Sequence, residues 1–548
     1  MDSRAAKCPH AKESAAVEVA RHKWTLAGLL SQRAQEAPDR PFVDVVGEAG
    51  DTFGQVHAAA RRWAGLVRGL GVAPGEYVAT MLAQPRMSLH GWFGINAARA
   101  GEVPVHLDYR GTYLAHVLNT TGVRVAIVDD GYVERFAEIA DEVPLLETLV
   151  VAGDADAARR LPWRVVALEP ALAVADPVDE SATLGQSDIS CVLFTSGTTG
   201  ASKAVLIPYG HIRASVDGAW PPGDLGPGDA YYSMLPLYHV AAKVAVGAML
   251  QAGGRVVLKP RFRTDEFWAE VRATGSTCVC LMGSMTGFLL DQPPRSDDRD
   301  HPLEKALIIP LPHQLDAFRE RFGVRVRTLY NQTETSAPLR SSDYDTPDYR
   351  ACGRPRPGVT CRLVDENDEE VAPGEVGELI VRCDEPWTMM AGYLGMAEKT
   401  VEAWRNQWMH TGDAFRMDAA GNYYFLDRMK DAIRRRGENI SSVELEASVC
   451  EHHAVLECAA VGVESEYEEE EEEVKVIVVP QSGVELAPAD LVEFLTERVP
   501  RFMVPRYVEV VPELPRTPTA KIRKVELRKL GITERTWDRE ALRPARGR

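Results

Sequence analysis

Residues 191–203, CVLFTSGTTGASK, are the most informative part of the sequence. An apolar run at 191–194 enters a loop of glycine and hydroxyl residues that ends in Lys203, and a second apolar run follows at 204–207. Backbone N–H groups in glycine-rich turns form concave anion sites, to which hydroxyls and a lysine add donors and charge. The segment therefore predicts a phosphate-binding loop at the end of a buried strand. It lacks the G-x-x-x-x-G-K-[ST] spacing of Walker A, and a surface hairpin rich in Ser and Thr is the alternative.

Short apolar runs alternate with helical patterns on both sides of this loop. The helical patterns lie at 58–68 and 87–99, and the apolar runs at Tyr77–Met81, 123–128, 149–152 and 256–258. This alternation is typical of βαβ units with buried, largely parallel sheets. Short strands are expected near 361–365 and 378–382.

A smaller block follows residue 428. It contains two predicted helices and two predicted strands, at Ser442–Cys450, 488–498, 459–463 and 474–480. The expected fold is thus α/β. A large multi-layer N-terminal domain with mostly parallel sheets occupies residues 1–428, and a small mobile α+β domain occupies residues 429–548. The glutamate run at 468–473 predicts a solvated hairpin tip, with an acidic docking patch as the alternative.

Composition excludes several classes of function. The 548 residues include 62 Lys and Arg and 80 Asp and Glu, a formal net charge of −18. So acidic a chain is a poor general binder of nucleic acid or anionic membrane, and a phosphorylated ligand must be held locally. Nothing approaches the ~18 consecutive apolar residues of a membrane-spanning helix. The nine cysteines form no C-x-x-C pair, which favours reduced thiols and a cytoplasmic location. We expect no nucleic-acid partner and no membrane insertion, and a homodimer is left open.

Residues 194–203 resemble the phosphate loop of the adenylate-forming superfamily, which comprises acyl-CoA synthetases, adenylation domains and luciferases. Six further segments resemble the family's motifs in the family's order: its aromatic/His motif, Y-G-x-T-E, T-G-D, inter-domain hinge, post-hinge loop and C-terminal lysine motif. These segments are LPLYHV at 235–240, YNQTE at 330–334, HTGD at 410–413, DRMK at 427–430, GENI at 437–440 and PRTPTAK at 515–521. The resemblance covers residues 24–530, and the stretch 235–413 looks most like the carnitine/crotonobetaine-type CoA ligases.

The resemblance implies an acyl-CoA ligase that uses ATP, Mg²⁺, CoA and a small-molecule carboxylic acid, and that forms AMP. Tyr330 would stack on adenine, Thr333 would donate to the α-phosphate, and Glu334 would hold Mg²⁺, a cation that prefers carboxylate oxygens. Asp413 would accept hydrogen bonds from the ribose hydroxyls, assisted by Arg428. The nucleotide-binding residues implied are Thr195, Ser196, Gly197, Thr198, Thr199, Lys203, Tyr330, Asn331, Gln332, Thr333, Asp413, Arg428 and Lys521.

The resemblance also implies two half-reactions. Lys521 would reach the carboxylate and the α-phosphate during adenylation. Rotation about a hinge at Lys430 would then remove Lys521 and bring in the loop that lines the CoA tunnel, while His239 gates the acyl side. The tunnel residues are Arg436, Gly437 and Glu438, and the catalytic set is Lys521, Thr333, Glu334 and His239. Outside the motif context, a Thr-Glu pair is also typical of a helix N-cap.

Four positions depart from the family pattern. LIIPLPHQ at 307–314 replaces a Gly-Ala-Pro-like segment, and Arg436 replaces a glycine. Asn331 also replaces a glycine, and asparagine tolerates left-handed backbone best after glycine. Ala520 stands where glycine usually precedes the lysine, which costs about 1–2 kcal/mol if φ must be positive there. These changes affect the ATP side more than the hinge.

Three alternative functions stay open. The chain could form only the thioester from a supplied acyl-adenylate, could be a non-catalytic ligase-like binding protein, or could be a luciferase-like oxygenase. An amino-acid adenylation domain is disfavoured, because 235–237 supplies no Asp for a substrate amine. The acid itself cannot be read from the sequence. Small residues at 241–248 fit either a bulky acyl group or tight helix packing, and Lys243 either pairs with an anionic substrate or, as we expect, faces water.

Overall fold

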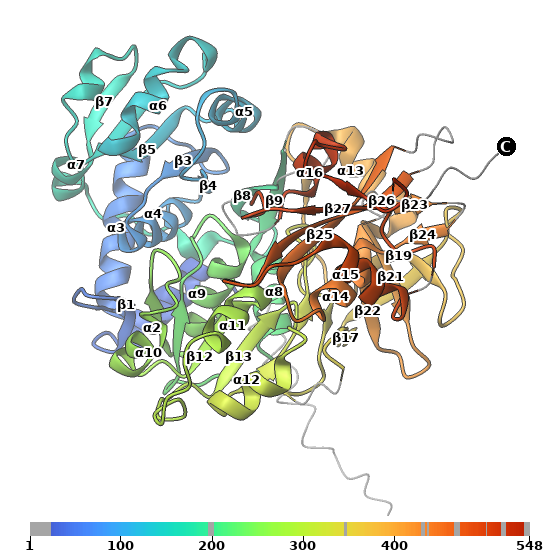
Figure 1. Cartoon of the computed structure of the whole chain (residues 1–548). Helices are drawn as coiled ribbons and strands as arrows, with labels where there is room; N and C mark the ends of the chain where they lie inside the picture. Colours follow the sequence, from blue (N-terminus) through green and yellow to red (C-terminus); the bar gives the residue numbers. More distant parts are fainter. Residues whose placement is uncertain are drawn as a thin grey trace, which may run out of the picture. The chain divides into compact units, whose positions relative to one another are not determined.

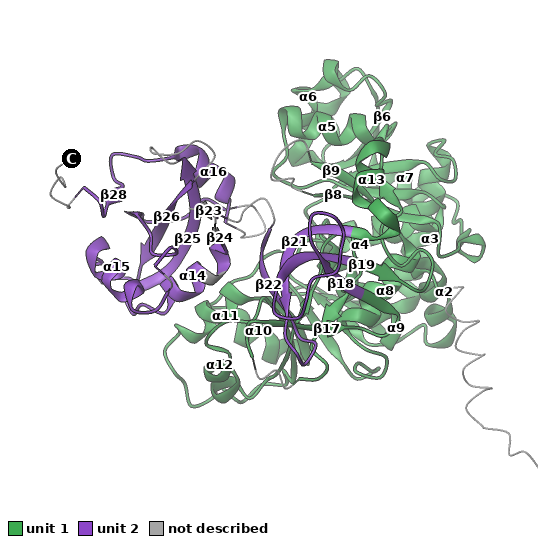
Figure 2. Cartoon of the chain, turned by 90° about the vertical axis from the view of Figure 1, so that its right-hand side faces the viewer, with its two compact units in different colours: residues 1–360, 381–409 green, residues 361–380, 410–548 purple. Residues whose placement is uncertain are grey.

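The computed structural model describes residues 24–195, 202–344, 348–428, 433–435, 438–464, 472–499, 501–516 and 522–541. The chain divides into two compact units, shown in Figure 2. The first comprises Met1–Thr360 and Val381–Met409, and the second comprises Cys361–Ile380 and His410–Arg548. The domain boundary predicted between residues 428 and 429 stays a prediction, because the proposed hinge residue, Lys430, lies outside the described residues.

One mostly parallel sheet of the first unit carries the strands on either side of the predicted phosphate loop. In its described part the strand order is β20-β9-β8-β4-β3-β5-β6-β7. Pairing is parallel from β8 through β7, and β9 and β20 are antiparallel to their neighbours. The strands are β3 (Tyr77–Met81), β4 (Gly101–Pro104), β5 (Val125–Asp129), β6 (Thr148–Ala152), β7 (Arg164–Ala167), β8 (Ile189–Thr195), β9 (Lys203–Pro208) and β20 (Gly392–Tyr393). The helices are α3 (Phe53–Gly69), α4 (Pro85–Ala97), α5 (Gly111–Thr121), α6 (Val133–Ala137), α7 (Leu168–Val174) and α13 (Ala397–Ala403).

Helices cover both faces of this sheet, as Figure 1 shows for the blue to cyan strands. In β5, Val125 and Ile127 pack into a core that includes side chains of α3 and α4. Ala126 and Val128 point the other way, into a core that includes side chains of α5 and α6. Successive side chains of a strand alternate between its faces, so a strand covered on both faces is apolar throughout. That is why these strands read as continuous apolar runs.

A second, mostly parallel sheet completes the core of the first unit. Its described strands have the order β14-β13-β12-β10-β11-β1-β2, with only β2 antiparallel to its neighbour. They are β1 (Pro41–Val45), β2 (Asp51–Thr52), β10 (Ala230–Ser233), β11 (Arg255–Leu258), β12 (Cys278–Met282), β13 (Lys305–Ile309) and β14 (Arg325–Arg327). The helices are α2 (Leu26–Glu36), α8 (Tyr209–Ala219), α9 (Val240–Ala252), α10 (Phe267–Thr274), α11 (Gly283–Leu290) and α12 (Leu315–Phe322).

Antiparallel strands follow in the chain. β15 (Leu329–Tyr330), β16 (Leu339–Arg340) and β17 (Ala351–Pro355) pair in the first unit. The second unit begins with β18 (Val359–Val364), β19 (Val376–Cys383), β21 (Met409–Met417) and β22 (Tyr423–Arg428), and the chain crosses between units within these strands.

The rest of the second unit is a small α+β block. Its described sheet has the order β25-β26-β27-β28, beside the pair β23-β24. The elements are β23 (Ile433–Arg435), β24 (Glu438–Ile440), β25 (Val455–Glu464), β26 (Glu472–Pro480), β27 (Tyr507–Val510), β28 (Trp537–Asp538), α14 (Ser442–Cys450), α15 (Pro488–Thr496) and α16 (Lys524–Leu530). The expected solvated glutamate tip is wrong for Glu473, which lies buried in β26 and pairs with Arg435 at 2.5 Å. Glu472 also lies in β26, and the rest of the run, 468–471, lies outside the described residues.

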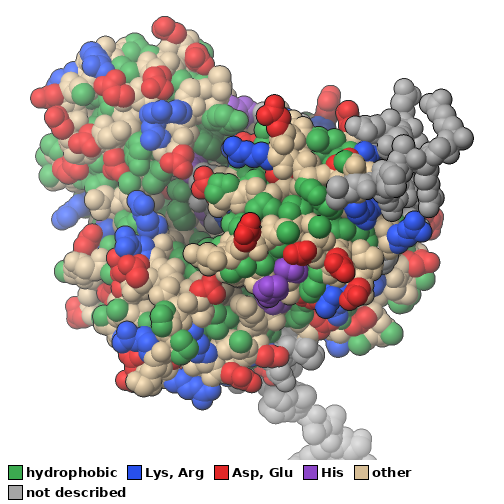
Figure 3. Space-filling view, in the orientation of Figure 1, with side chains coloured by type: hydrophobic (Ala, Val, Ile, Leu, Met, Phe, Trp, Pro, Cys, Tyr) green, Lys and Arg blue, Asp and Glu red, His purple; other side chains and the backbone are tan. Residues whose placement is uncertain are grey.

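These features confirm the predicted α/β class. Two mostly parallel sheets form the large unit, and the α+β block matches the helix predicted at Ser442–Cys450. On the face drawn in Figure 3, acidic and basic side chains are interspersed over the described surface. None of the described helices has both the length and the apolar character that crossing a bilayer requires.

Candidate active site

The strands β8 and β9 place Thr195 and Lys203 at the two ends of the predicted phosphate loop. The two residues are direct partners in the antiparallel register, so they lie side by side where the hairpin opens. The Lys203 ammonium lies 4.5 Å from the centroid of the Tyr393 ring, a cation–π contact. The loop residues between them, Ser196, Gly197, Thr198 and Thr199, lie outside the described residues.

Tyr393 connects this lysine to the predicted metal ligand, Glu334. It lies in β20, opposite Val205 of β9, and its hydroxyl donates to Glu334 Oε1 at 3.0 Å. The pKa of Tyr393 is raised well above its usual value, first by burial and then by the Glu334 carboxylate. The phenol therefore stays protonated and keeps donating, which orients the carboxylate. Sequence reasoning missed Tyr393; an aromatic residue in the Gly392-Tyr393 segment was its only signal.

The YNQTE segment forms a tight turn after β15. The Gln332 N–H donates to Thr335 Oγ1 at 3.1 Å, and the Thr335 N–H donates back to the Gln332 carbonyl at 3.2 Å. Asn331 Oδ1 accepts the Ala337 N–H at 2.7 Å, a contact that glycine could not make. Among the described residues of this loop, positive φ occurs at Ala337, with φ 50°, rather than at Asn331. Asn331 therefore stabilises the loop through its side chain, not through left-handed backbone.

Two of the predicted nucleotide residues flank this turn. Tyr330 closes β15 and is buried. Thr333 is partly exposed, immediately before Glu334. The turn thus holds the predicted adenine, phosphate and metal contacts on a few consecutive residues.

The predicted ribose contacts lie together in the second unit. Asp413 in β21 and Arg428 in β22 are direct register partners, with Arg428 Nε 3.9 Å from Asp413 Oδ1. Gly412 adopts φ 69°, and its N–H donates to Glu378 Oε1 at 2.8 Å. The other oxygen of Glu378 lies 2.9 Å from His410 Nδ1. Glu378 therefore fixes the turn that presents Asp413, and no motif identified it.

His239 is the N-cap residue of α9 and lies in a group of aromatic rings. Its ring centroid is 4.6 Å from that of Tyr238 and 6.3 Å from that of His106. His106 lies 4.5 Å from Tyr238 and 5.2 Å from Tyr109, also between ring centroids. We call His106, Tyr109, Tyr238 and His239 the imidazole–tyrosine cluster. Sequence reasoning identified only His239 in it.

The expectation that Lys243 faces water is wrong. Its side chain is 1% exposed, and its ammonium donates to Glu102 Oε2 at 2.5 Å, a carboxylate that is fully buried. The ammonium also lies 3.8 Å from the Trp92 ring centroid, and Thr80 Oγ1 donates to Glu102 Oε1 at 2.9 Å. The pair ties α9 to β4. The burial of Lys243 could not be predicted from its neighbours in the sequence, because its partner, Glu102, lies 141 positions earlier.

The small residues of α9 serve helix packing at Gly247. A Cβ there would come within 3.0 Å of Val216 in α8 and 3.6 Å of Leu26 in α2. Of the two interpretations of this stretch, tight packing therefore applies at that position.

Most of the site residues predicted in the lid lie outside the described residues, namely Lys430, Arg436, Gly437 and Lys521. Glu438 opens β24. Arg516 and Ile522, on either side of 517–521, form an antiparallel bridge. Asp427, just before the predicted hinge, accepts the Ser442 N–H at 2.8 Å and also bonds the Ser442 hydroxyl.

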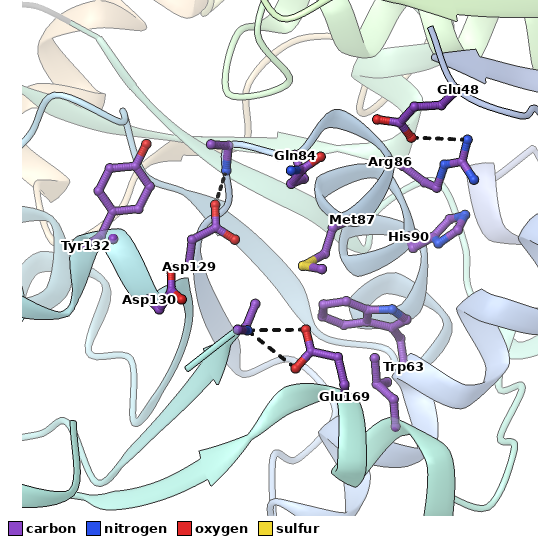
Figure 4. Close-up of a pocket in the computed structure, with 15 residues that line it drawn as sticks. Glu48, Trp63, Gln84, Arg86, Met87, His90, Asp129, Asp130, Tyr132 and Glu169 are labelled. Carbon is purple, nitrogen blue, oxygen red and sulfur yellow. Dashed lines mark hydrogen bonds and ion pairs between the residues drawn. The ribbon is translucent and has the colours of Figure 1, made fainter. Parts of the chain in front are cut away.

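A cavity of about 700 Å³ lies elsewhere, at the carboxyl ends of β3, β5 and β6 (Figure 4). Its lining includes none of the predicted site residues. Its carboxylates accept backbone N–H groups: Asp129 from Ala83 at 2.6 Å and Asp130 from Asp154 at 2.9 Å. Burial, followed by its acidic neighbours, raises the pKa of Asp129. In the part of the chain that the structure describes, no three His, Cys, Asp or Glu side chains group to hold a metal.

The comparisons with known proteins agree with this arrangement. Residues 30–394 match the AMP-binding enzyme family, and residues 444–521 match the AMP-binding enzyme C-terminal domain. The crotonobetaine/carnitine–CoA ligase of Salmonella arizonae is 28% identical over 487 residues, which cover 87% of this chain and 93% of that protein.

Solved structures share the fold. The anthranilate CoA ligase AuaEII in complex with anthranoyl-AMP has a TM-score of 0.83 at 22% identity, covering 93% of this chain and 97% of that one. ATP-bound MatB from Rhodopseudomonas palustris has a TM-score of 0.80 at 24% identity, covering 92% and 98%. The first match spans more than half of the chain and includes Lys203, Glu334 and Tyr393, whereas Asp413 and Arg428 lie between the two matched segments. The chain therefore belongs to the AMP-binding enzyme family, the adenylate-forming superfamily of the acyl-CoA ligases.

Proposed function

We propose that the protein activates a small carboxylic acid with ATP to an acyl-adenylate and then transfers the acyl group to CoA. The observation that carries the proposal is the connected set Lys203, Tyr393 and Glu334, in which one hydroxyl joins a cation to a carboxylate. The curated CoA ligases to which the chain is similar support CoA as the acceptor.

The first half-reaction concentrates negative charge on the α-phosphate as the carboxylate attacks. Pre-organised donors lower the energy of such a transition state because they need no reorientation when the charge develops. Thr333 and Lys203 would supply these donors, and Lys521 would contact both the acid and the α-phosphate. Glu334 offers the hard oxygen ligand that Mg²⁺ prefers, and bound Mg²⁺ would neutralise phosphate charge. Asp413 and Arg428 would hold the ribose.

In the second half-reaction, rotation at Lys430 would exchange Lys521 for the loop of Arg436, Gly437 and Glu438. His239 would separate the acyl pocket from the path of the thiol. The lid boundary at 428/429, the roles of these residues, the cytoplasmic location and the option of a homodimer stay predictions from the sequence.

Measuring the two half-reactions separately tests the proposal. Pyrophosphate exchange into ATP with an acid alone reports adenylation, and thioester formation from a synthetic acyl-adenylate reports transfer. We expect both for the native protein, and steady AMP release only with acid and CoA together. Pyrophosphate exchange that shows no preference among acids would contradict the full reaction. Thioester formation without pyrophosphate exchange would also contradict it, and would identify an enzyme that forms only the thioester.

Lys521→Ala sharpens this test. Loss of a transition-state donor should lower adenylation by about 100-fold or more, and transfer from supplied acyl-adenylate should be spared. Lys529→Ala, an exposed lysine of α16, is the matched control and should change neither rate. Equal loss of both half-reactions in Lys521→Ala would refute the rotating lid.

Glu334→Gln tests the metal assignment. The amide keeps the shape but lacks the charge that binds Mg²⁺, so a higher Mg²⁺ concentration should be needed for half-maximal adenylation. An unchanged Mg²⁺ dependence would remove Glu334 from the metal site.

A further inference from the structure

His106 carries a buried hydrogen-bond donor that no group of the described residues accepts. Its side chain is 11% exposed, and its Nδ1 accepts the Asp108 N–H at 3.0 Å. That bond assigns the proton of the neutral imidazole to Nε2. In the described part of the chain Nε2 is buried and has no hydrogen-bond partner. Buried polar groups without partners are rare in native structures and frequently mark a place where a ligand or a water binds.

The neutral form is the one that this environment favours. Burial lowers the pKa of His106 below its usual value, against a weaker opposing effect of the Asp108 carboxylate. Near neutral pH the residue is therefore an N–H donor rather than a cation. The rings around it, Tyr109, Tyr238 and His239, have centroids 4.5 to 6.3 Å away. Aromatic rings around a fixed polar group are typical of small-molecule recognition.

The protein also fixes where this donor lies relative to His239. Glu102 lies in β4, four positions before His106, and Lys243 lies in α9, four positions after His239. Their buried contact, 2.5 Å from Nζ to Oε2, ties the two segments together. The donor and the predicted acyl-side residue are thus held together by a contact outside the cluster, which pre-organises them.

We propose that His106 is a specificity-determining residue: its Nε2–H donates to an oxygen on the acyl part of the carboxylic acid, apart from the carboxylate that reacts. This inference rests on the proposed ligase function and names its substrate class, acids that carry a hydroxyl, oxo or second carboxylate oxygen. An acid of the same shape without that oxygen would leave Nε2–H unpaired. Sites built around a hydrogen bond discriminate strongly against such analogues.

Matched acids test the assignment. Ligase kcat/KM is measured for butanoate against 3-hydroxybutanoate and for benzoate against each hydroxybenzoate, with native protein, His106→Phe and His106→Gln. The native protein should prefer the oxygenated member of at least one pair by about tenfold or more. His106→Phe should abolish that preference mainly by slowing the oxygenated acid, and His106→Gln, which keeps an N–H donor, should retain part of it. His57→Gln, at an exposed contact with Asp179, should leave every ratio unchanged.

Two outcomes overturn the inference while leaving the ligase function intact. The native protein could turn over acids with no preference in any pair, or His106→Phe could slow both members of a pair equally. In either case Nε2–H binds a water or the ring serves packing only.

A binding measurement keeps the two proposals separable if no acid is turned over. The ¹⁵N resonance of His106 Nε2, assigned with His106→Gln, is followed during titration with the same acids. A shift caused by an oxygenated acid and not by its partner supports the assignment even then. No shift with any acid, or equal shifts within every pair, refutes it.

Discussion

Replacing Lys243 with methionine should destabilise the first unit by several kcal/mol. The ammonium is 1% exposed and lies 2.5 Å from a fully buried carboxylate, Glu102. Methionine keeps the apolar stem but leaves that carboxylate buried without a counter-charge. Removing one partner of a buried ion pair costs about 3–5 kcal/mol. The hydrogen bond from Thr80 to Glu102 remains at 2.9 Å, which favours the lower end of this range.

The expected change in melting temperature follows from the size of the unit, Met1–Thr360 with Val381–Met409. Unfolding entropy of about 2.1 cal/mol/K per residue gives about 0.8 kcal/mol/K for a unit of this length. A loss of 3–4 kcal/mol therefore lowers its Tm by about 4–5 °C, measured by scanning calorimetry. The double variant Glu102→Leu/Lys243→Met should recover most of the loss, because an apolar pair often replaces a buried ion pair at little cost.

A Lys243→Met variant that melts within about 1 °C of the native protein would contradict this prediction, since the protein would then tolerate an isolated buried carboxylate. The double variant gives a second test. If its Tm lies below that of Lys243→Met by about as much as Lys243→Met lies below the native protein, the two side chains contribute independently and the prediction is wrong.

Three further predictions concern the site and its surroundings. Tyr393→Phe removes the hydroxyl that donates to Glu334 at 3.0 Å. Loss of one hydrogen bond worth about 1.4 kcal/mol should lower the rate of pyrophosphate exchange about tenfold, and acyl transfer from a supplied acyl-adenylate should not change. Asn331→Gly leaves the buried Ala337 N–H without its acceptor and should cost about 1–2 kcal/mol, seen as a lower Tm. Burial lowers the pKa of His211 from 6.5 to about 4. The unfolded chain then binds one more proton between these values, so stability falls as the pH falls through that window, by up to about 1.4 kcal/mol per pH unit. His211→Leu should flatten the fall of Tm between pH 6.5 and pH 4.

Conservative variants supply the controls. Tyr424→Phe removes a hydroxyl that donates to the turn residue Asp418 at 3.0 Å and should leave exchange unaffected. Asn331→Asp keeps an acceptor for Ala337 and should melt above Asn331→Gly. A Tyr393→Phe enzyme with native exchange would mean that the phenol does not orient Glu334. If the Tm of His211→Leu and the Tm of the native protein fall equally between pH 6.5 and pH 4, the pKa of His211 does not differ between the folded and the unfolded chain.

Local patterns predicted the elements well. They identified the strand Tyr77–Met81 and the helix Ser442–Cys450 with the observed bounds. The motifs named Asp413 and Arg428, which the structure places as register partners. Such signals are readable because they lie within a few residues of one another or in a familiar motif.

Contacts between distant segments could not be predicted. Tyr393 reaches Glu334 only because β20 pairs with β9, and Lys243 is buried only because β4 supplies Glu102. A single sequence contains no local sign of either pairing. Glu473 is a second case in which a distant partner decides burial, here for a residue that its neighbours in the sequence predict to be solvated. A glutamate run indicates a solvated segment unless a buried arginine, here Arg435, lies where the strand enters the core.

If the C-terminal domain rotates as proposed, the contact between Asp427 and Ser442 would favour one of its two orientations. Asp427 is 4% exposed and lies before the predicted pivot at Lys430, whereas Ser442 begins the helix after it. A rotation that separates β22 from α14 would remove the two hydrogen bonds that the Asp427 carboxylate accepts from Ser442, at about 1.5–3 kcal/mol for each bond to a charged group. The two orientations of the predicted lid would then differ in population by about tenfold or more, and substrate binding would have to reverse that preference.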